Sequence, residues 1–104
     1  MIVKNADSKD YVETVPSGFA DWMDYWAKGG SISNKPKKYQ CAVHHKYEDD
    51  LEGAHVKKLI DGIFEGHKIY IVPVCKEIND QFGKSFEVSD DQLVEIPADH
   101  YSKK

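Results

Sequence analysis

Two cysteines and two adjacent histidines are the residues of this sequence best suited to bind a metal ion. Cys41 and His44 are separated by two residues, His45 follows directly, and Cys75 stands between an expected strand and an expected helix. Thiolates and imidazoles at such spacings, on a turn and at a helix start, are typical ligands of tetrahedral zinc. The position three residues after Cys75 is Ile78, which cannot ligate a metal. A further histidine or carboxylate would therefore have to complete the zinc site.

The cysteines leave two alternatives open. Cys41 and Cys75 could be small buried apolar residues that bind no metal. They could also form a disulfide, which the reducing conditions inside cells disfavour.

The elements that must position these residues begin with a helix expected over residues 18–28. Ser17 is a suitable N-cap, and the glycines at 29–30 end the helix. The apolar face is formed by residues at helical spacing: Phe19, Trp22, Met23 and Trp26.

After this helix the apolar pattern becomes short and predicts strands over 39–43, 53–59 and 68–73. The last two are expected to form an antiparallel hairpin, because turn dipeptides lie between them, and Pro73 is expected to end the last strand. A short helix over 75–82 then completes a ββα unit. The N-terminal helix is expected to cover a core that includes Val56, Ile69, Ile71 and Val74.

The whole chain is expected to be one α+β domain with polar ends. Two further short strands are predicted at 86–88 and 93–96, with a turn at 89–91 between them. Residues 1–16 are expected to be a loosely ordered N-terminal arm, residues 17–97 the domain, and residues 98–104 a polar tail.

This order of features resembles small HNH-like, treble-clef zinc proteins over about residues 17–96. The similarity is carried by the Trp-x3-Trp helix, the Cys-x2-His turn, Gly-Ala-His-Val at 53–56 and Ile-Tyr-Ile-Val-Pro-Val-Cys at 69–75. In HNH nucleases the histidine that ends the first hairpin strand is the general base, and an asparagine in the next segment supports it. By position, the resemblance implies these roles for His55 and Asn79.

The sequence departs from active HNH enzymes where they bind their catalytic metal. Ala54 stands where those enzymes carry a metal ligand, and residues 80–84 contain no final histidine. Phosphodiester hydrolysis of this type needs a cation to neutralise the phosphate. We therefore expect a non-catalytic binding or interaction module derived from an HNH-like zinc domain, with a nucleic acid or a protein as its partner. The alternatives are a small metal-dependent HNH-type nuclease and a phage- or plasmid-type accessory inhibitor protein.

The charge balance disfavours a general polyanion-binding protein. The net charge is −4, and all 14 basic residues are lysines, so the bidentate arginine contacts to guanine or phosphate are absent. Lysines can still make salt-dependent contacts to phosphate that are independent of base sequence. The candidates, which share one face only if the strands that carry them pair, are Lys35, Lys37, Lys38, Lys57 and Lys58. The alternative interpretation is an ordinary surface of mixed charge.

No membrane or nucleotide-binding signal is present. No apolar run approaches the ~18–20 residues of a membrane span, and the first ten residues lack the apolar core of a signal peptide. The glycine motifs that bind nucleotides are also missing. We therefore expect a cytoplasmic protein with no membrane partner and no small-molecule cofactor besides the possible zinc.

Overall fold

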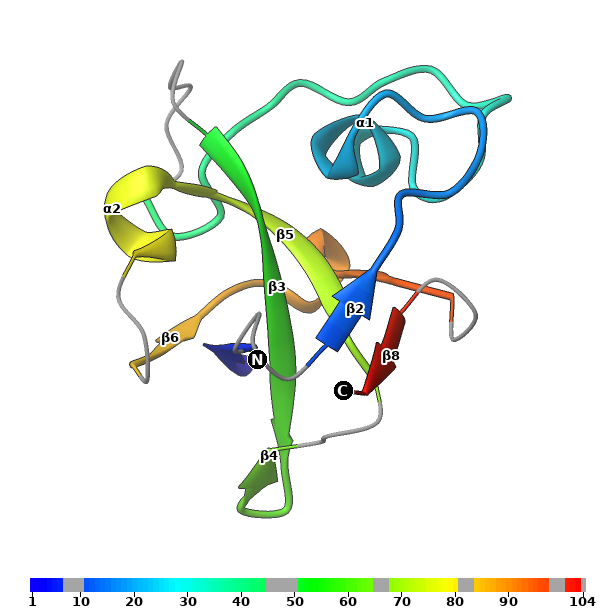
Figure 1. Cartoon of the computed structure of the whole chain (residues 1–104). Coiled ribbons are helices and arrows are strands. Elements are labelled where there is room, and N and C mark those ends of the chain that lie inside the picture. Colours follow the sequence, from blue (N-terminus) through cyan, green and yellow to red (C-terminus); the bar gives the residue numbers. More distant parts are fainter. Residues whose placement is uncertain (7–10, 45–50, 65–67, 81–83, 98–100, 104) are drawn as a thin grey trace.

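A mostly antiparallel sheet and two short helices form the small α+β structure of this chain (Figure 1). In this computed structural model the described residues are 1–6, 11–44, 51–64, 68–80, 84–97 and 101–103.

The main sheet is built around one long strand, β3. The order of the sheet is β6-β1-β3-β5-β7, and β4 pairs with the far end of β3. The bounds of these strands are Ile2–Asn5 for β1, Leu51–Ile60 for β3, Ile63–Phe64 for β4, Tyr70–Cys75 for β5, Ser85–Glu87 for β6 and Val94–Glu95 for β7. The predicted pairing of the 53–59 and 68–73 segments is confirmed, since β3 and β5 are antiparallel neighbours. The hairpin between β3 and β4 turns at Asp61 and Gly62, which both have positive φ.

Strand β5 continues through Pro73, which was expected to end it. Pro73 lies opposite Gly53 of β3. On the other side of β5, strand β7 pairs only with Tyr70 and Ile71, so none of the described strands there requires an N–H donor from Pro73. All six residues of β5 are buried.

Both ends of the chain contribute strands, in contrast to the expected arm and tail. Strand β1 lies between β3 and β6, and Val3 is fully buried. Strand β2 (Tyr11–Glu13) pairs with β8 (Tyr101–Lys103) in a separate two-stranded sheet. These strands are short, and their pairing partners lie far away in the sequence. Local patterns therefore do not reveal them.

Helix α1 (Trp22–Ala27) begins later than expected. Its N-cap is Asp21, whose carboxylate accepts a hydrogen bond of 2.8 Å from the backbone N–H of Asp24. Ser17 is wrong as the N-cap, because Gly18 has a φ of +96° and cannot be the first helical residue. Phe19 thus lies outside the helix but still packs edge-on against Tyr25, with a centroid distance of 5.0 Å.

The remaining elements differ from the predictions in smaller ways. Helix α2 (Lys76–Asn79) is shorter than the expected 75–82, although residues 81–83 lie outside the described part of the chain. A 3₁₀ helix, η1 (Asp90–Gln92), replaces the expected turn between β6 and β7. The segment 39–43 contains no strand; its Ala42 donates a backbone hydrogen bond to β5, and the segment then turns.

The two faces of the sheet carry separate core clusters. Trp26 of α1 packs with Ile69 and Ile71, as predicted. Val56 and Val74 belong to the other cluster, so the expectation that α1 covers them is wrong. The reason is the alternation of side chains along a strand, which directs Ile71 and Val74 to opposite faces.

Candidate metal centre

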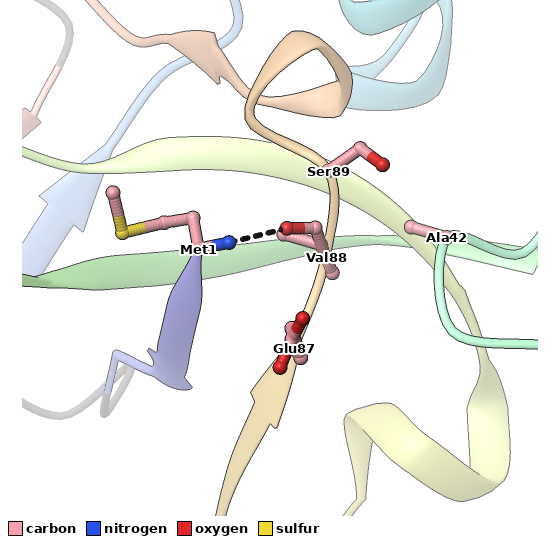
Figure 2. Close-up of a pocket in the computed structure, with 5 residues that line it drawn as sticks. All are labelled: Met1, Ala42, Glu87, Val88 and Ser89. Atoms are coloured by element: carbon pink, nitrogen blue, oxygen red, sulfur yellow. Dashed lines mark hydrogen bonds between the residues drawn. The ribbon is translucent and has the colours of Figure 1, made fainter.

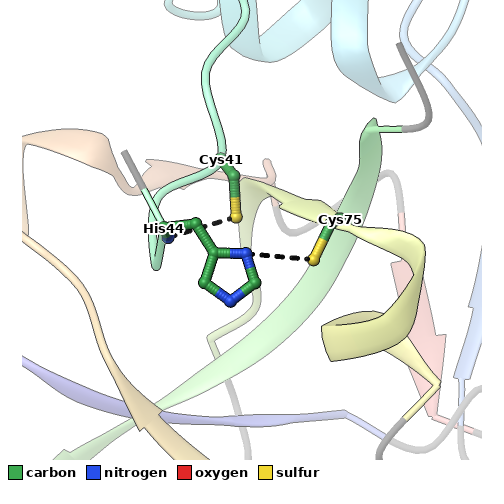
Figure 3. A group of neighbouring side chains, drawn as sticks. All are labelled: Cys41, His44 and Cys75. Carbon is green, nitrogen blue, oxygen red and sulfur yellow. Dashed lines mark hydrogen bonds between the residues drawn. The ribbon is translucent and has the colours of Figure 1, made fainter. Parts of the chain in front are cut away.

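Three of the predicted ligands come together where the 41–44 turn meets the end of β5. The ligand atoms of Cys41, His44 and Cys75 all lie within 4.8 Å of one another (Figure 3). Within this cluster, His44 Nδ1 and Cys75 Sγ are 3.6 Å apart. The two sulfurs lie close together, and neither cysteine is in a disulfide. His45 lies outside the described residues.

A backbone turn presents Cys41 and His44. The N–H of Ala42 donates to the carbonyl oxygen of Pro73 at 2.8 Å, which fastens the turn to β5. The N–H of His44 then donates to Cys41 Sγ at 3.4 Å. This bond closes the turn at which the segment departs from an extended conformation, and it holds both ligands on the same side.

Cys75 is presented by the junction of β5 and α2. It is the last residue of the strand and the N-cap of the helix. Cys75 is 5% exposed and Cys41 is fully buried, whereas His44 is exposed. The sulfurs therefore face the protein interior, and the imidazole forms the solvent side of the cluster.

A polar contact that no sequence pattern predicted holds α2 in place. The side-chain amide of Asn5, in β1, donates to the carbonyl oxygens of Ile78 at 3.4 Å and Asn79 at 3.2 Å. The side chain of Asn79 in turn donates to Glu52 of β3. Helix α2 has only four residues, so these bonds fix an element that cannot form by itself. They thereby help to position Cys75.

The donor atoms, and the separation of Cys75 Sγ from His44 Nδ1, fit a tetrahedral zinc ion. With Zn–S bonds of about 2.3 Å and Zn–N bonds of about 2.0–2.1 Å, a tetrahedral site separates its S and N ligands by roughly 3.6 Å. The distance of 3.6 Å between Cys75 Sγ and His44 Nδ1 matches this value. Two thiolates and an imidazole are also soft ligands that select zinc over magnesium or calcium. Cys41, His44 and Cys75 could thus hold zinc and leave one position for a fourth ligand.

The residues that the HNH resemblance assigned to catalysis lie elsewhere. His55 sits in the middle of β3, and its ring packs edge-on against Trp22 with a centroid distance of 5.3 Å. Asn79 contacts Glu52, whose side chain points to the opposite face of β3 from His55. The structure therefore places the side chains of His55 and Asn79 on different sides of the sheet.

The candidate lysines do not share one face. Lys57 and Lys58 are neighbours in β3, so their side chains point to opposite faces of the sheet. Lys58 lies 3.6 Å from Asp90 and 4.4 Å from the centre of the Tyr70 ring. Lys35, Lys37 and Lys38 are all exposed in the segment that leads to Cys41, and Lys37 Nζ lies 5.2 Å from the centre of the Trp26 ring.

A pocket of about 450 Å³ adjoins the turn that carries Cys41 (Figure 2). Its walls are formed by residues from three segments: Met1, Ala42, Glu87, Val88 and Ser89. The amino group of Met1 donates to the carbonyl oxygen of Val88 at 2.8 Å and so joins the start of β1 to the end of β6. Ala42 is the direct neighbour of Cys41, so this pocket and the metal centre share one turn.

Comparisons with protein-family models, curated proteins and solved structures give no match for this chain. Neither described helix has the length and apolar character that a bilayer span requires.

Proposed function

We propose that this chain is a non-catalytic binding module, stabilised by zinc and derived from an HNH-like, treble-clef zinc domain. The observation that carries the proposal is the cluster of Cys41, His44 and Cys75, with its S–N distance of 3.6 Å. The order of β3, β5 and α2 after the Cys-x2-His turn also agrees with a ββα zinc domain.

Zinc would cross-link a segment without regular structure to the main sheet. Residues 31–41 contain no helix or strand, and the turn at their end is fastened to β5 by the backbone hydrogen bond from Ala42. A metal bound by Cys41, His44 and Cys75 would fix this segment to the start of α2. In small domains, the free energy of metal binding adds directly to the free energy of folding.

The packing of His55 supports a binding role over a catalytic one. Its ring lies against Trp22, on the face of the sheet that α1 covers. Among the described residues, the group of metal-ligating side chains forms at Cys41, His44 and Cys75 and does not include His55. A general base for phosphodiester attack needs a metal and a substrate phosphate beside it.

The contact surface that we favour is the segment before Cys41. It exposes Lys35, Lys37 and Lys38 together with Ile32, which is 62% exposed, and Tyr39, which is 39% exposed. The lysines could contact phosphate groups of a nucleic acid, and the apolar residues could contact a protein. Salt separates these partners, because phosphate contacts by lysine weaken steeply as ionic strength rises.

The zinc proposal is tested by native mass spectrometry of protein purified without chelator. We expect one zinc ion per chain, and no zinc in the Cys41→Ser and Cys75→Ser variants. His44→Ala and His55→Ala form a matched pair, since both remove one imidazole but only His44 belongs to the cluster. Zinc should be lost or weakened in His44→Ala and retained in His55→Ala. Metal-free wild-type protein, or equal zinc binding by the two histidine variants, would refute the proposed site.

The non-catalytic part of the proposal is tested with double-stranded and single-stranded DNA in the presence of Mg²⁺, Mn²⁺ or Zn²⁺. We expect no cleavage above that of a buffer control. Metal-dependent cleavage that His55→Ala abolishes would instead establish the nuclease alternative.

A further inference from the structure

The metal centre contains two cysteines whose sulfurs can react with each other. We infer that Cys41 and Cys75 are also a peroxide-sensitive thiol pair, and that the disulfide between them excludes the metal. The thiol chemistry follows from the two sulfurs alone, whereas the metal release rests on the proposed function. Both sulfurs lie within 4.8 Å of each other, and neither is in a disulfide (Figure 3).

Cys75 is the more exposed of the two cysteines, although both are buried. It is 5% exposed, whereas Cys41 is fully buried. Its neighbour in the cluster, His44, is exposed and borders the solvent side. Oxidation of cysteines follows exposure as well as thiolate character, so attack by Cys75 on the oxidant should precede any reaction of Cys41.

The reaction has two steps that balance with hydrogen peroxide as the oxidant. The Cys75 sulfur attacks one peroxide oxygen, the O–O bond breaks, an S–O bond forms, and one water leaves; the product is a sulfenic acid. The Cys41 sulfur then attacks the Cys75 sulfur, the S–O bond breaks, an S–S bond forms, and a second water leaves. In total, two thiols are oxidised to one disulfide and one peroxide is reduced to two waters.

The local structure permits the sulfurs to approach. A disulfide needs an S–S distance of about 2.05 Å, so one side must move by a few ångströms. Cys75 is anchored in β5, which is buried along its whole length. Cys41 lies in the turn that the Ala42 hydrogen bond fastens to β5, so the approach must come mainly from rotation of the two cysteine side chains.

Disulfide formation and metal binding compete for the same two atoms. Zinc binds thiolates, and the sulfurs of a disulfide carry no charge and bind zinc poorly. After oxidation, His44 would be the remaining ligand of the three. Peroxide would therefore release the metal, and the disulfide would replace the metal as the cross-link between the 41–44 turn and β5.

The thiol pair is tested on the full wild-type chain, freed of metal by chelation and treated with a small excess of hydrogen peroxide. We expect the intact mass to fall by two hydrogens, and peptide mapping to show a Cys41–Cys75 cross-link that a reductant reverses. Dimedone, which traps sulfenic acids, should label Cys75 in the Cys41→Ser variant faster than it labels Cys41 in Cys75→Ser. A wild-type product with sulfinic acid or unreacted thiols in place of the cross-link would overturn the inference, whatever the folding of the variants.

A parallel sample loaded with Zn²⁺ separates this inference from the proposed function. We expect peroxide to release one zinc per chain, measured with a chromogenic chelator, at the same rate as the cross-link forms. If no zinc binds, the proposed function and the metal release both fail, while the metal-free sample still decides the thiol pair. If zinc binds normally but the metal-free protein forms no cross-link, the further inference alone fails.

Discussion

Replacing Asn5 with alanine should destabilise the domain far more than its place in a short terminal strand suggests. Asn5 is 7% exposed and donates from its side chain to the carbonyl oxygens of Ile78 and Asn79. These carbonyls lie in the last turn of α2, where a helix has no internal donors for them. The Asn5→Ala variant loses both bonds and also leaves a small cavity.

The expected cost follows from the geometry of these bonds. Each hydrogen bond contributes about 1 kcal/mol net, and leaving its buried partner unsatisfied costs about 1–3 kcal/mol. One bond is long, at 3.4 Å, and the Oδ1 atom of Asn5 is buried without a hydrogen-bond partner in the described part of the chain, so the lower values apply. The sum is roughly 2–3 kcal/mol, which corresponds to a fall in Tm of roughly 10–20 °C for a domain of this size.

Thermal unfolding followed by circular dichroism measures this effect. Asn79→Ala is the comparison variant, because it removes one half-buried side-chain bond to the Glu52 carboxylate and should cost about 1.5 kcal/mol, the low end for a bond to a charged group. Asn5→Leu fills the space of the asparagine side chain but supplies no donor, so it should remain well below wild type. A Tm for Asn5→Leu equal to or above that of wild type would show that the carbonyls of α2 do not need Asn5.

Three further outcomes are expected. Gly53→Ala should lower the free energy of unfolding by about 1–3 kcal/mol and with it the urea midpoint, because its Cβ would lie 3.2 Å from Cβ of Trp22 and 3.4 Å from Cγ2 of Ile71. An unchanged midpoint would mean that α1 shifts freely on the sheet. Burial, together with the nearby Glu95 carboxylate, raises the pKa of Tyr25 above its usual 10.0. The folded state therefore holds this proton more tightly than the unfolded state, and stability should fall as pH rises above 10. Tyr25→Phe should weaken this pH dependence. It should also cost about 1 kcal/mol at neutral pH, because it loses the 2.8 Å bond to the Glu95 carbonyl. An alkaline stability profile that Tyr25→Phe leaves unchanged would contradict a role for the Tyr25 proton. If the partner is a nucleic acid, Lys35→Glu and Lys38→Glu should weaken binding in a filter or anisotropy assay, and Lys68→Glu, outside that segment, should not; equal losses would indicate non-specific charge effects.

The fold could be predicted from the sequence where contacts are local or the pattern is dense. The pairing of β3 with β5 was recognisable from a β-branched run that follows turn dipeptides, and α1 from aromatic residues at helical spacing. The start of α1 was wrong because Ser17 satisfies the capping preference, yet the backbone of Gly18 excludes a helix there. Strands β1 and β8 were missed because their partners are far away in the sequence and their own patterns are short.

The candidate site divides in a similar way: the sequence reveals the metal ligands but not the residue that supports them. Cysteine and histidine are rare and chemically distinct, so Cys41, His44 and Cys75 stand out by residue type and spacing alone, and their convergence requires only that the turn meets the end of β5. Asn5 has no such signal, since an asparagine in a polar segment usually indicates a loop. Only the register of β1 on β3, which pairs Asn5 with Val56, brings its amide to the carbonyls of α2. Placement of Cys75 thus depends on a residue near the start of the chain, and loss of Asn5 should weaken the proposed zinc binding without removing any ligand.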